Sequence, residues 1–117
     1  MSERDAACLF CRIASGEVPS DRVYEDDDVI AFRDVAPRAP THVLVIPRRH
    51  IPDAQSLTDV DAALLASCFA ALRRVADVER LAGGYRIVTN SGPDAGQTVP
   101  HLHFHLLGGR QMGWPPG

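Results

Sequence analysis

The segment HLHFHLL, residues 101–107, alternates histidine with apolar side chains. Alternation with a period of two is typical of a β-strand, because successive side chains of a strand point to opposite faces. We therefore predict a strand over 101–107. In it His101, His103 and His105 share the face that points away from the core, with adjacent imidazoles about 7 Å apart. The apolar side chains between them are expected to enter the core and pack on a helix.

The whole sequence predicts a single α+β domain. The expected elements, in chain order, are a short helix in 9–17, two strands in 21–35 around an acidic turn at 25–28, a strand at 42–47, a long helix between Thr58 and Gly83–Gly84, a strand at 85–90 and the strand at 101–107. Such segregation of helices and strands favours a five-stranded, mainly antiparallel sheet with one long and one short helix. The domain is assigned to residues 1–117, with a flexible start at 1–7 and an irregular tail at 108–117.

The long helix is the clearest of these elements. Thr58 is a suitable N-cap, and Asp59 and Asp61 lie in the first turn, where the helix dipole favours carboxylates. Cys68 is expected to be a small buried side chain. Apolar residues recur at roughly helical spacing and are expected to form the buried stripe: Val60, Leu64, Phe69, Leu72 and Val75.

Composition excludes several classes of function. The formal net charge is −3 and no basic block occurs, which argues against a nucleic-acid partner. No apolar run reaches the roughly 20 residues of a membrane span, and no signal-peptide pattern is present, so a cytoplasmic protein without a membrane partner is expected. All 12 basic residues are arginine, which excludes a Schiff-base or Walker-type lysine. Acid–base chemistry near neutral pH would therefore fall mainly to histidine.

Three interpretations of the histidine face are open on these residues alone: an exposed polar strand, a metal site, and catalysis by a neutral imidazole. The preceding loop, NSGPDAGQTVP, favours a phosphate ligand. Gly92 and Gly96 let the backbone approach a ligand closely, and consecutive N–H groups can form an anion nest. Gln97 and Thr98 add neutral hydrogen-bond donors.

Cys8 and Cys11 form a C-x2-C pair, and the third cysteine, Cys68, makes a disulfide framework improbable in a reducing compartment. Three interpretations of the pair stay open. It is a redox motif, two small core residues on a helix, or half of a zinc site.

Two long segments extend the evidence beyond the motif. They are CLFCRIASGEVPSDRVYEDDDVIAFRDVAPRAPTHVLVIPRRHI, residues 8–51, and GYRIVTNSGPDAGQTVPHLHFHLLGGRQMGWPPG, residues 84–117. Together with the His-φ-His-φ-His-φ-φ pattern, in which φ is apolar, they resemble the histidine triad (HIT) family and in particular its Hint branch of nucleotide-binding proteins.

The resemblance implies a homodimer whose subunits share one continuous sheet. It also implies a purine nucleotide-binding hydrolase that cleaves the P–N bond of adenosine 5′-phosphoramidates or hydrolyses the related aminoacyl adenylates. It implies that His103 attacks the α-phosphorus and that His105 binds phosphate oxygens and helps protonate the leaving group. His101 and His42 complete the hydrogen-bond relay. No cofactor is required for this chemistry. Dinucleoside polyphosphate hydrolysis and a non-enzymatic role in nucleotide sensing or partner binding are the alternatives.

The resemblance also implies a binding site for a ligand of the AMP or GMP type. Asp34 would bind the ribose hydroxyls, Phe10, Ile13, Phe32 and Val35 would form the base pocket, and the phosphate and leaving group would meet Asn90, Gly96, Gln97 and Thr98. Trp114 belongs to a tail that reaches the neighbouring subunit's site.

Many bacterial relatives bind structural zinc, and the matching ligands here are Cys8, Cys11, His50 and His101, so that His101 has two candidate roles. The chain departs from animal relatives at Arg33 and Gly113, where they often carry histidine. We expect these positions to affect base and leaving-group preference.

Overall fold

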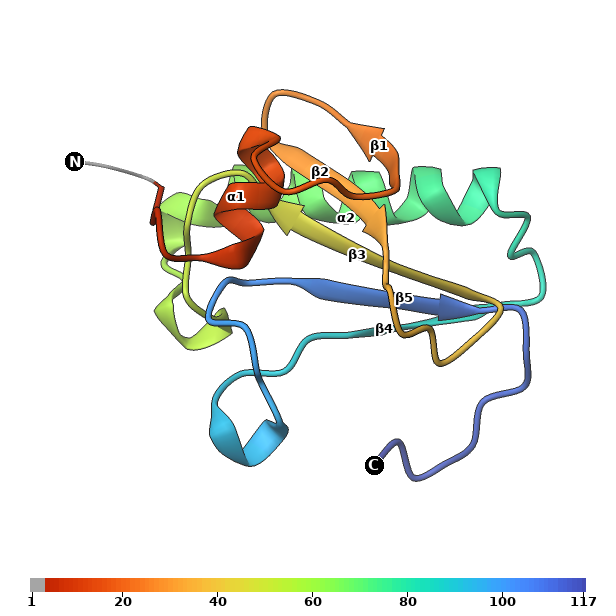
Figure 1. Ribbon diagram of the computed structural model, residues 1–117. Helices are drawn as coiled ribbons and strands as arrows, with labels where there is room; N and C mark the ends of the chain where they lie inside the picture. Colours follow the sequence, from red (N-terminus) through yellow and green to blue (C-terminus); the bar gives the residue numbers. More distant parts are fainter. Residues whose placement is uncertain (1–3) are drawn as a thin grey trace.

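Five strands form one antiparallel sheet in the order β1-β2-β3-β5-β4 (Figure 1). The computed structural model describes residues 4–117. The strands are β1 (Arg22–Glu25), β2 (Val29–Arg33), β3 (Thr41–Pro47), β4 (Tyr85–Val88) and β5 (Phe104–Gly108), and the helices are α1 (Leu9–Ser15) and α2 (Ala62–Val78). Three 3₁₀ turns complete the elements: η1 (Ala54–Ser56), η2 (Asp59–Asp61) and η3 (Pro93–Ala95). The predicted α+β fold with a five-stranded sheet is confirmed.

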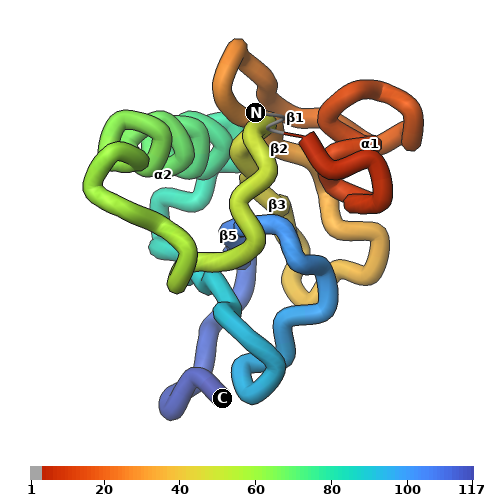
Figure 2. Tube along the Cα trace, turned by 90° about the vertical axis from the view of Figure 1, so that its left-hand side faces the viewer, coloured from red at the N-terminus to blue at the C-terminus, as the bar shows by residue number. Residues whose placement is uncertain are grey.

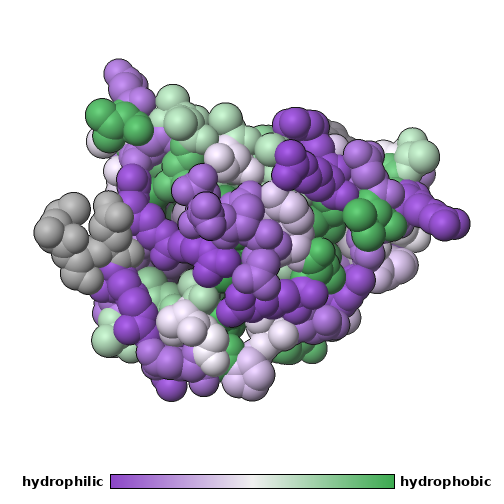
Figure 3. Space-filling model, turned by 90° about the horizontal axis from the view of Figure 1, so that it is seen from above, coloured by the Kyte–Doolittle hydropathy of each residue, from purple (hydrophilic) through white to green (hydrophobic). Residues whose placement is uncertain are grey.

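The sheet is covered on both faces, by α2 on one side and by α1 on the other (Figure 2). On β2, Val29 and Ala31 pack in the cluster that includes α2, whereas Ile30 and Phe32 pack in a second cluster with α1. Side chains that alternate along a strand are thus buried on both faces, which is why β2 and β3 read as nearly continuous apolar runs. Seen from above (Figure 3), the surface is mostly hydrophilic and its apolar side chains form separate patches.

The last strand begins later than predicted. β5 starts at Phe104, and residues 101–103 lie in an irregular segment in which the Leu102 N–H donates to the carbonyl of Ile51 at 2.6 Å. Pairing with β3 ends at Val45–Phe104, although β3 continues to Pro47 and stays paired with β2 there. The alternation of faces nevertheless persists, and Leu102, Phe104 and Leu106 lie in the α2 cluster as predicted.

The expectation that the histidine face points away from the core is wrong. His101 is fully buried and His103 is 6% exposed. The physical reason is the apolar cluster on the α1 side of the sheet, because Phe10 of α1 packs edge-on against both His101 and His103. The histidines therefore lie between the sheet and α1.

The long helix is shorter than predicted at both ends. Thr58 caps the 3₁₀ turn η2, where its backbone N–H donates to the Asp61 carboxylate at 2.9 Å, and α2 begins at Ala62. Val60 lies before α2 and is 87% exposed, so its place in the buried stripe is also wrong, and Phe69 is only half-buried. α2 ends at Val78, and Arg80 then adopts the left-handed conformation with φ +58°, well before Gly83. The buried face of α2 consists of Cys68, Ala71, Leu72, Val75 and Ala76.

Neither end of the chain adds a regular element. Of the segment expected to be flexible, residues 1–3 lie outside the described residues, and the Cys8 N–H donates to the Asp5 carbonyl at 3.0 Å. The tail beyond Gly108 is irregular, as its glycines and prolines predict. Within residues 4–117, no helix is long and apolar enough to cross a membrane.

Leu72→Ala should lower the free energy of unfolding by about 2–5 kcal/mol, because Leu72 is fully buried between α2 and the sheet. Urea denaturation measures this loss. The matched control, Val60→Ala, should change the free energy by less than about 0.5 kcal/mol, because this side chain is exposed. Equal losses in the two variants would contradict the packing described for α2.

Candidate functional site

Two of the triad histidines open onto a cleft of about 700 Å³ between α1, the end of β2 and the segment before β5. His103 and His105 form one side of the cleft, and Asp34 lies at the end of β2. The apolar walls include Phe10 and Ile13 from α1 and Phe32 from β2. The cleft therefore combines a mostly apolar wall with imidazole and carboxylate groups.

One ring nitrogen of His103 is committed to the backbone. Its Nδ1 lies 2.7 Å from the carbonyl oxygen of His101, which can only accept a hydrogen bond. Nδ1 therefore carries the proton, and in the neutral imidazole Nε2 keeps its lone pair. Phe10 stands perpendicular to the ring, with centroids 5.1 Å apart, and holds its plane. His103 is thus oriented with Nε2 as its nucleophilic atom.

A second chain of hydrogen bonds fixes the tautomers of His42 and His105. The backbone N–H of Arg38 donates to His42 Nδ1 at 3.0 Å, so the proton of neutral His42 lies on Nε2. His42 Nε2 is 2.9 Å from His105 Nδ1, which must then accept. His105 is left with its proton on Nε2. Asp34 Oδ2, 3.4 Å from His42 Nε2, is a second acceptor for the same proton.

Burial keeps these imidazoles neutral. It lowers the pKa of His42, and it lowers the pKa of His105 to about 4, with further contributions from the neighbouring His103 and His42. Because both groups are neutral at pH 7, each has one donor and one acceptor nitrogen, as the hydrogen-bond pattern requires.

Asp34, His42 and His105 also place three ligand-type atoms within 4.8 Å of one another. A metal on His42 Nε2 would require the proton to sit on Nδ1, but Nδ1 already accepts the Arg38 N–H. This group of atoms is therefore a hydrogen-bond relay and not a metal site.

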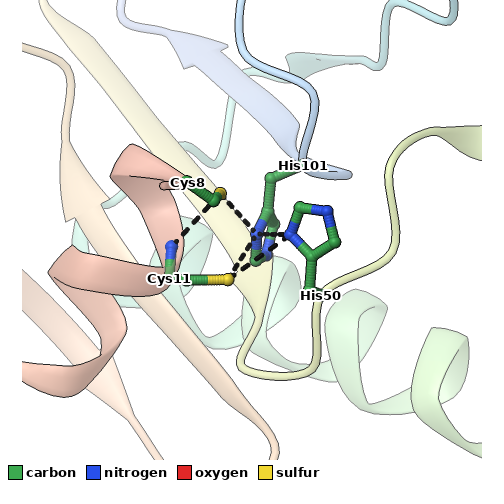
Figure 4. Close-up of side chains that lie close together, drawn as sticks. All are labelled: Cys8, Cys11, His50 and His101. Carbon is green, nitrogen blue, oxygen red and sulfur yellow. Dashed lines mark hydrogen bonds between the residues drawn. The ribbon is translucent and has the colours of Figure 1, made fainter. Parts of the chain in front are cut away.

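Cys8, Cys11, His50 and His101 form a cysteine–histidine cluster (Figure 4). The cysteines come from the start of α1, His50 follows β3 and His101 precedes β5. His101 Nδ1 lies 3.3 Å from Cys8 Sγ, 3.5 Å from Cys11 Sγ and 3.3 Å from His50 Nδ1. Burial raises the pKa of the Cys11 thiol and lowers the pKa of His101 to about 4. The four ligand-type atoms therefore converge in a buried space.

The predicted base-pocket and phosphate residues divide into two groups. Phe10, Ile13, Phe32, Asp34, Val35 and Thr98 all line the cleft. Asn90, Gly96 and Gln97 are not part of its lining among residues 4–117. The Gln97 amide instead makes hydrogen bonds within its loop and to the segment after β3. Its oxygen accepts the Gly92 N–H, and its NH₂ group donates to the carbonyls of Val99 and Pro52.

Sequence reasoning missed two contributors to the site. The Arg38 N–H sets the tautomers of the relay, but a backbone donor leaves no residue-type signal. Cleft residues between α1 and β1 were also missed, including Val18 and Pro19. The fixed turn geometry of the Val-Pro pair was the one signal available for them.

A second hollow of about 580 Å³ lies against the first turns of α2 and holds none of the histidines. Arg48 and Arg49 on its wall are paired with Glu25 and Asp61. Both arginines therefore serve ion pairs within the fold, and we take the histidine cleft as the candidate functional site.

Comparison with known proteins identifies the family of the chain. The HIT domain family matches residues 15–112. An uncharacterized HIT-like protein of Synechococcus elongatus is 51% identical over 109 residues, covering 93% of this chain and 96% of the relative. A HIT family hydrolase from Legionella pneumophila superposes with a TM-score of 0.93 at 50% identity, covering 94% and 99% of the two chains. A histidine triad protein from Clostridium difficile gives 0.91 at 38% identity, covering 94% and 96%. On this sequence match and this geometry, the chain belongs to the HIT domain family.

Proposed function

We propose that the protein is a purine nucleotide-binding hydrolase that cleaves the P–N bond of adenosine 5′-phosphoramidates, or the anhydride P–O bond of aminoacyl adenylates, through a nucleotidyl-histidine intermediate. The observation that carries the proposal is the tautomer of His103, whose Nδ1–H bonds to the His101 carbonyl and leaves Nε2 as a nucleophile at the cleft. The family match and the relatives named as hydrolases support hydrolysis in general.

In the proposed first step, His103 Nε2 attacks the α-phosphorus, a new P–N bond forms and the bond to the leaving amine breaks. The anionic phosphate favours the protonated form of His105, so the pKa of His105 should rise when nucleotide binds. Protonated His105 gives its Nε2 proton to the leaving amine. In the second step water attacks the phosphorus, its proton returns to His105, and the monophosphate and free His103 are released.

The rest of the cleft accounts for nucleoside binding. Phe10, Ile13 and Phe32 offer an apolar slot for the base. Asp34 lies at the rim, where its carboxylate can accept hydrogen bonds from both ribose hydroxyls. The Asp34 carboxylate and the imidazoles thus lie next to one another beside the apolar slot, as the adjacent ribose and phosphate of a nucleotide require.

We also propose that Cys8, Cys11, His50 and His101 hold a structural zinc ion. Two thiolates and two imidazoles suit tetrahedral zinc, whose ligand atoms lie roughly 3.3–3.8 Å apart. The four measured separations, 3.3–3.5 Å, fit this spacing. His101 Nε2 lies 2.8 Å from the Pro47 carbonyl, so its proton is on Nε2 and the lone pair of Nδ1 faces the cluster. A bound zinc would hold α1 against the His101 segment.

A homodimer is part of the proposal. β4 lies at the edge of the sheet and its outer backbone groups have no strand partner within the described chain. Tyr85 on that strand and Trp114 in the tail are 41% and 82% exposed. Pairing of two β4 strands would extend the sheet and cover apolar surface.

His103→Ala should abolish release of AMP from adenosine 5′-phosphoramidate, with kcat falling by about 10⁴-fold or more, because the covalent route is lost. AMP binding should change less than tenfold. Product analysis by chromatography and calorimetry with AMP measure the two effects. Equal turnover in wild type and variant would contradict His103 as the nucleophile. Faster turnover of diadenosine polyphosphate than of the phosphoramidate would favour the alternative hydrolase activity.

The imidazole signals of His105 should show no titration between pH 8 and pH 5.5 in the free protein, since burial holds its pKa near 4. Two-dimensional NMR of ¹⁵N-histidine-labelled protein, with His105→Gln for assignment, checks this. AMP should move the midpoint upward. Because the folded pKa lies below the unfolded value of about 6.5, stability is lost as pH falls from 6.5 towards 4. A free-state midpoint near 6.5 would contradict the buried neutral state.

The chain should bind one Co²⁺ per subunit with the visible absorption of a tetrahedral cobalt thiolate, and Zn²⁺ should displace it. Cys11→Ser should weaken or remove this absorption. Cys68→Ala is the matched control and should retain it, because Cys68 lies on the buried face of α2, outside the cysteine–histidine cluster. An unchanged spectrum in Cys11→Ser would contradict the proposed ligand set.

A further inference from the structure

One carboxylate connects the end of α2 to both strands that flank the β2–β3 connection. Glu79, directly after α2, accepts two hydrogen bonds from the Arg33 guanidinium, with Nη1–Oε1 2.8 Å and Nη2–Oε2 3.0 Å. Its Oε1 also accepts a hydrogen bond from the Thr41 hydroxyl at 3.4 Å. The Glu79 side chain is 16% exposed, and a bidentate Arg–carboxylate pair has a defined geometry.

Both partners of Glu79 directly precede residues of the site. Arg33 precedes Asp34, and Thr41 precedes His42. The Asp34 N–H donates to the His42 carbonyl at 3.0 Å. The Asp34 carboxylate accepts the Ala36 N–H at 2.8 Å, which fixes the turn that follows. The end of β2, which presents Asp34, is thus held by the bond between Glu79 and Arg33, the residue before Asp34.

We propose that Glu79 is a positioning residue for nucleotide binding, acting through Arg33 to fix the end of β2 so that Asp34 meets the ribose hydroxyls. The inference rests on the proposed function, in which Asp34 binds ribose. Arg33 lines the cleft beside Asp34, but its guanidinium is engaged by Glu79, and its Nε lies 3.6 Å from the Asp21 carboxylate. We therefore assign Arg33 the role of holding the end of β2.

The kinetic consequence is specific. A ribose contact is made equally in the ground state and the transition state, so its loss raises KM and leaves kcat nearly unchanged. A general loosening of the fold would instead weaken the binding of every ligand, including one without ribose hydroxyls. The effect of Glu79 is therefore expected only when the ligand carries those hydroxyls.

The test compares AMP with 2′,3′-dideoxy-AMP by calorimetry in wild type, Glu79→Gln and Glu25→Gln. Glu79→Gln keeps the shape of the side chain but loses its charge and one acceptor. It should weaken AMP binding by roughly three- to tenfold, as for a weakened charge-assisted contact, and weaken dideoxy-AMP binding less than about twofold. Glu25 accepts from Arg22 and Arg48 at 3.0 and 3.1 Å, away from the cleft, so Glu25→Gln should change neither affinity.

Equal weakening of both ligands in Glu79→Gln, or no weakening of either, would overturn the positioning role. If wild type binds AMP and dideoxy-AMP equally, the ribose contact of Asp34 is absent and the proposal fails with it, while turnover by His103 is tested separately. Arg33→Met, which removes the guanidinium from the other side of the pair, should reproduce the Glu79→Gln pattern. It serves in place of Glu79→Gln if thermal unfolding shows that variant to be unfolded.

Discussion

The hydrogen bond from His103 Nδ1 to the carbonyl oxygen of His101 decides which nitrogen of His103 can react. The carbonyl is fixed because His101 is itself held at both ring nitrogens. Nε2 bonds to the Pro47 carbonyl, and Nδ1 faces the cysteines and His50. The two roles considered for His101 are therefore compatible, since its side chain belongs to the cluster and its backbone orients His103.

The short helix α1, with seven residues, contributes both to the cysteine–histidine cluster and to the cleft. α1 carries Cys8 as its N-cap and Cys11 in its first turn, and Phe10 between them packs against His101, His103 and Phe32. A helix this short has little stability of its own. Whatever holds the cysteines therefore also holds one wall of the cleft, which links the proposed zinc site to nucleotide binding through Phe10.

Local pattern was enough to predict the fold and much of the site. The period of two placed Leu102, Phe104 and Leu106 against α2, and the family resemblance brought together His42, Asp34 and the triad. The sequence-based predictions failed where contacts between distant segments determine the local structure. The late start of β5 depends on where its pairing with β3 ends, and the burial of the histidines depends on α1. The Arg38 N–H and the pairing of Arg33 with Glu79 join positions whose side-chain types carry no signal of the contact.

The stereochemical course at phosphorus tests the central claim, attack by His103 Nε2, most directly. The measurement uses a P-chiral adenosine 5′-phosphoramidothioate hydrolysed in ¹⁸O-labelled water, with the product configuration read by ³¹P NMR. Two successive in-line displacements, first by His103 and then by water, predict overall retention. Overall inversion would mean that water attacks the phosphorus directly, and would contradict the assignment of His103 as the nucleophile.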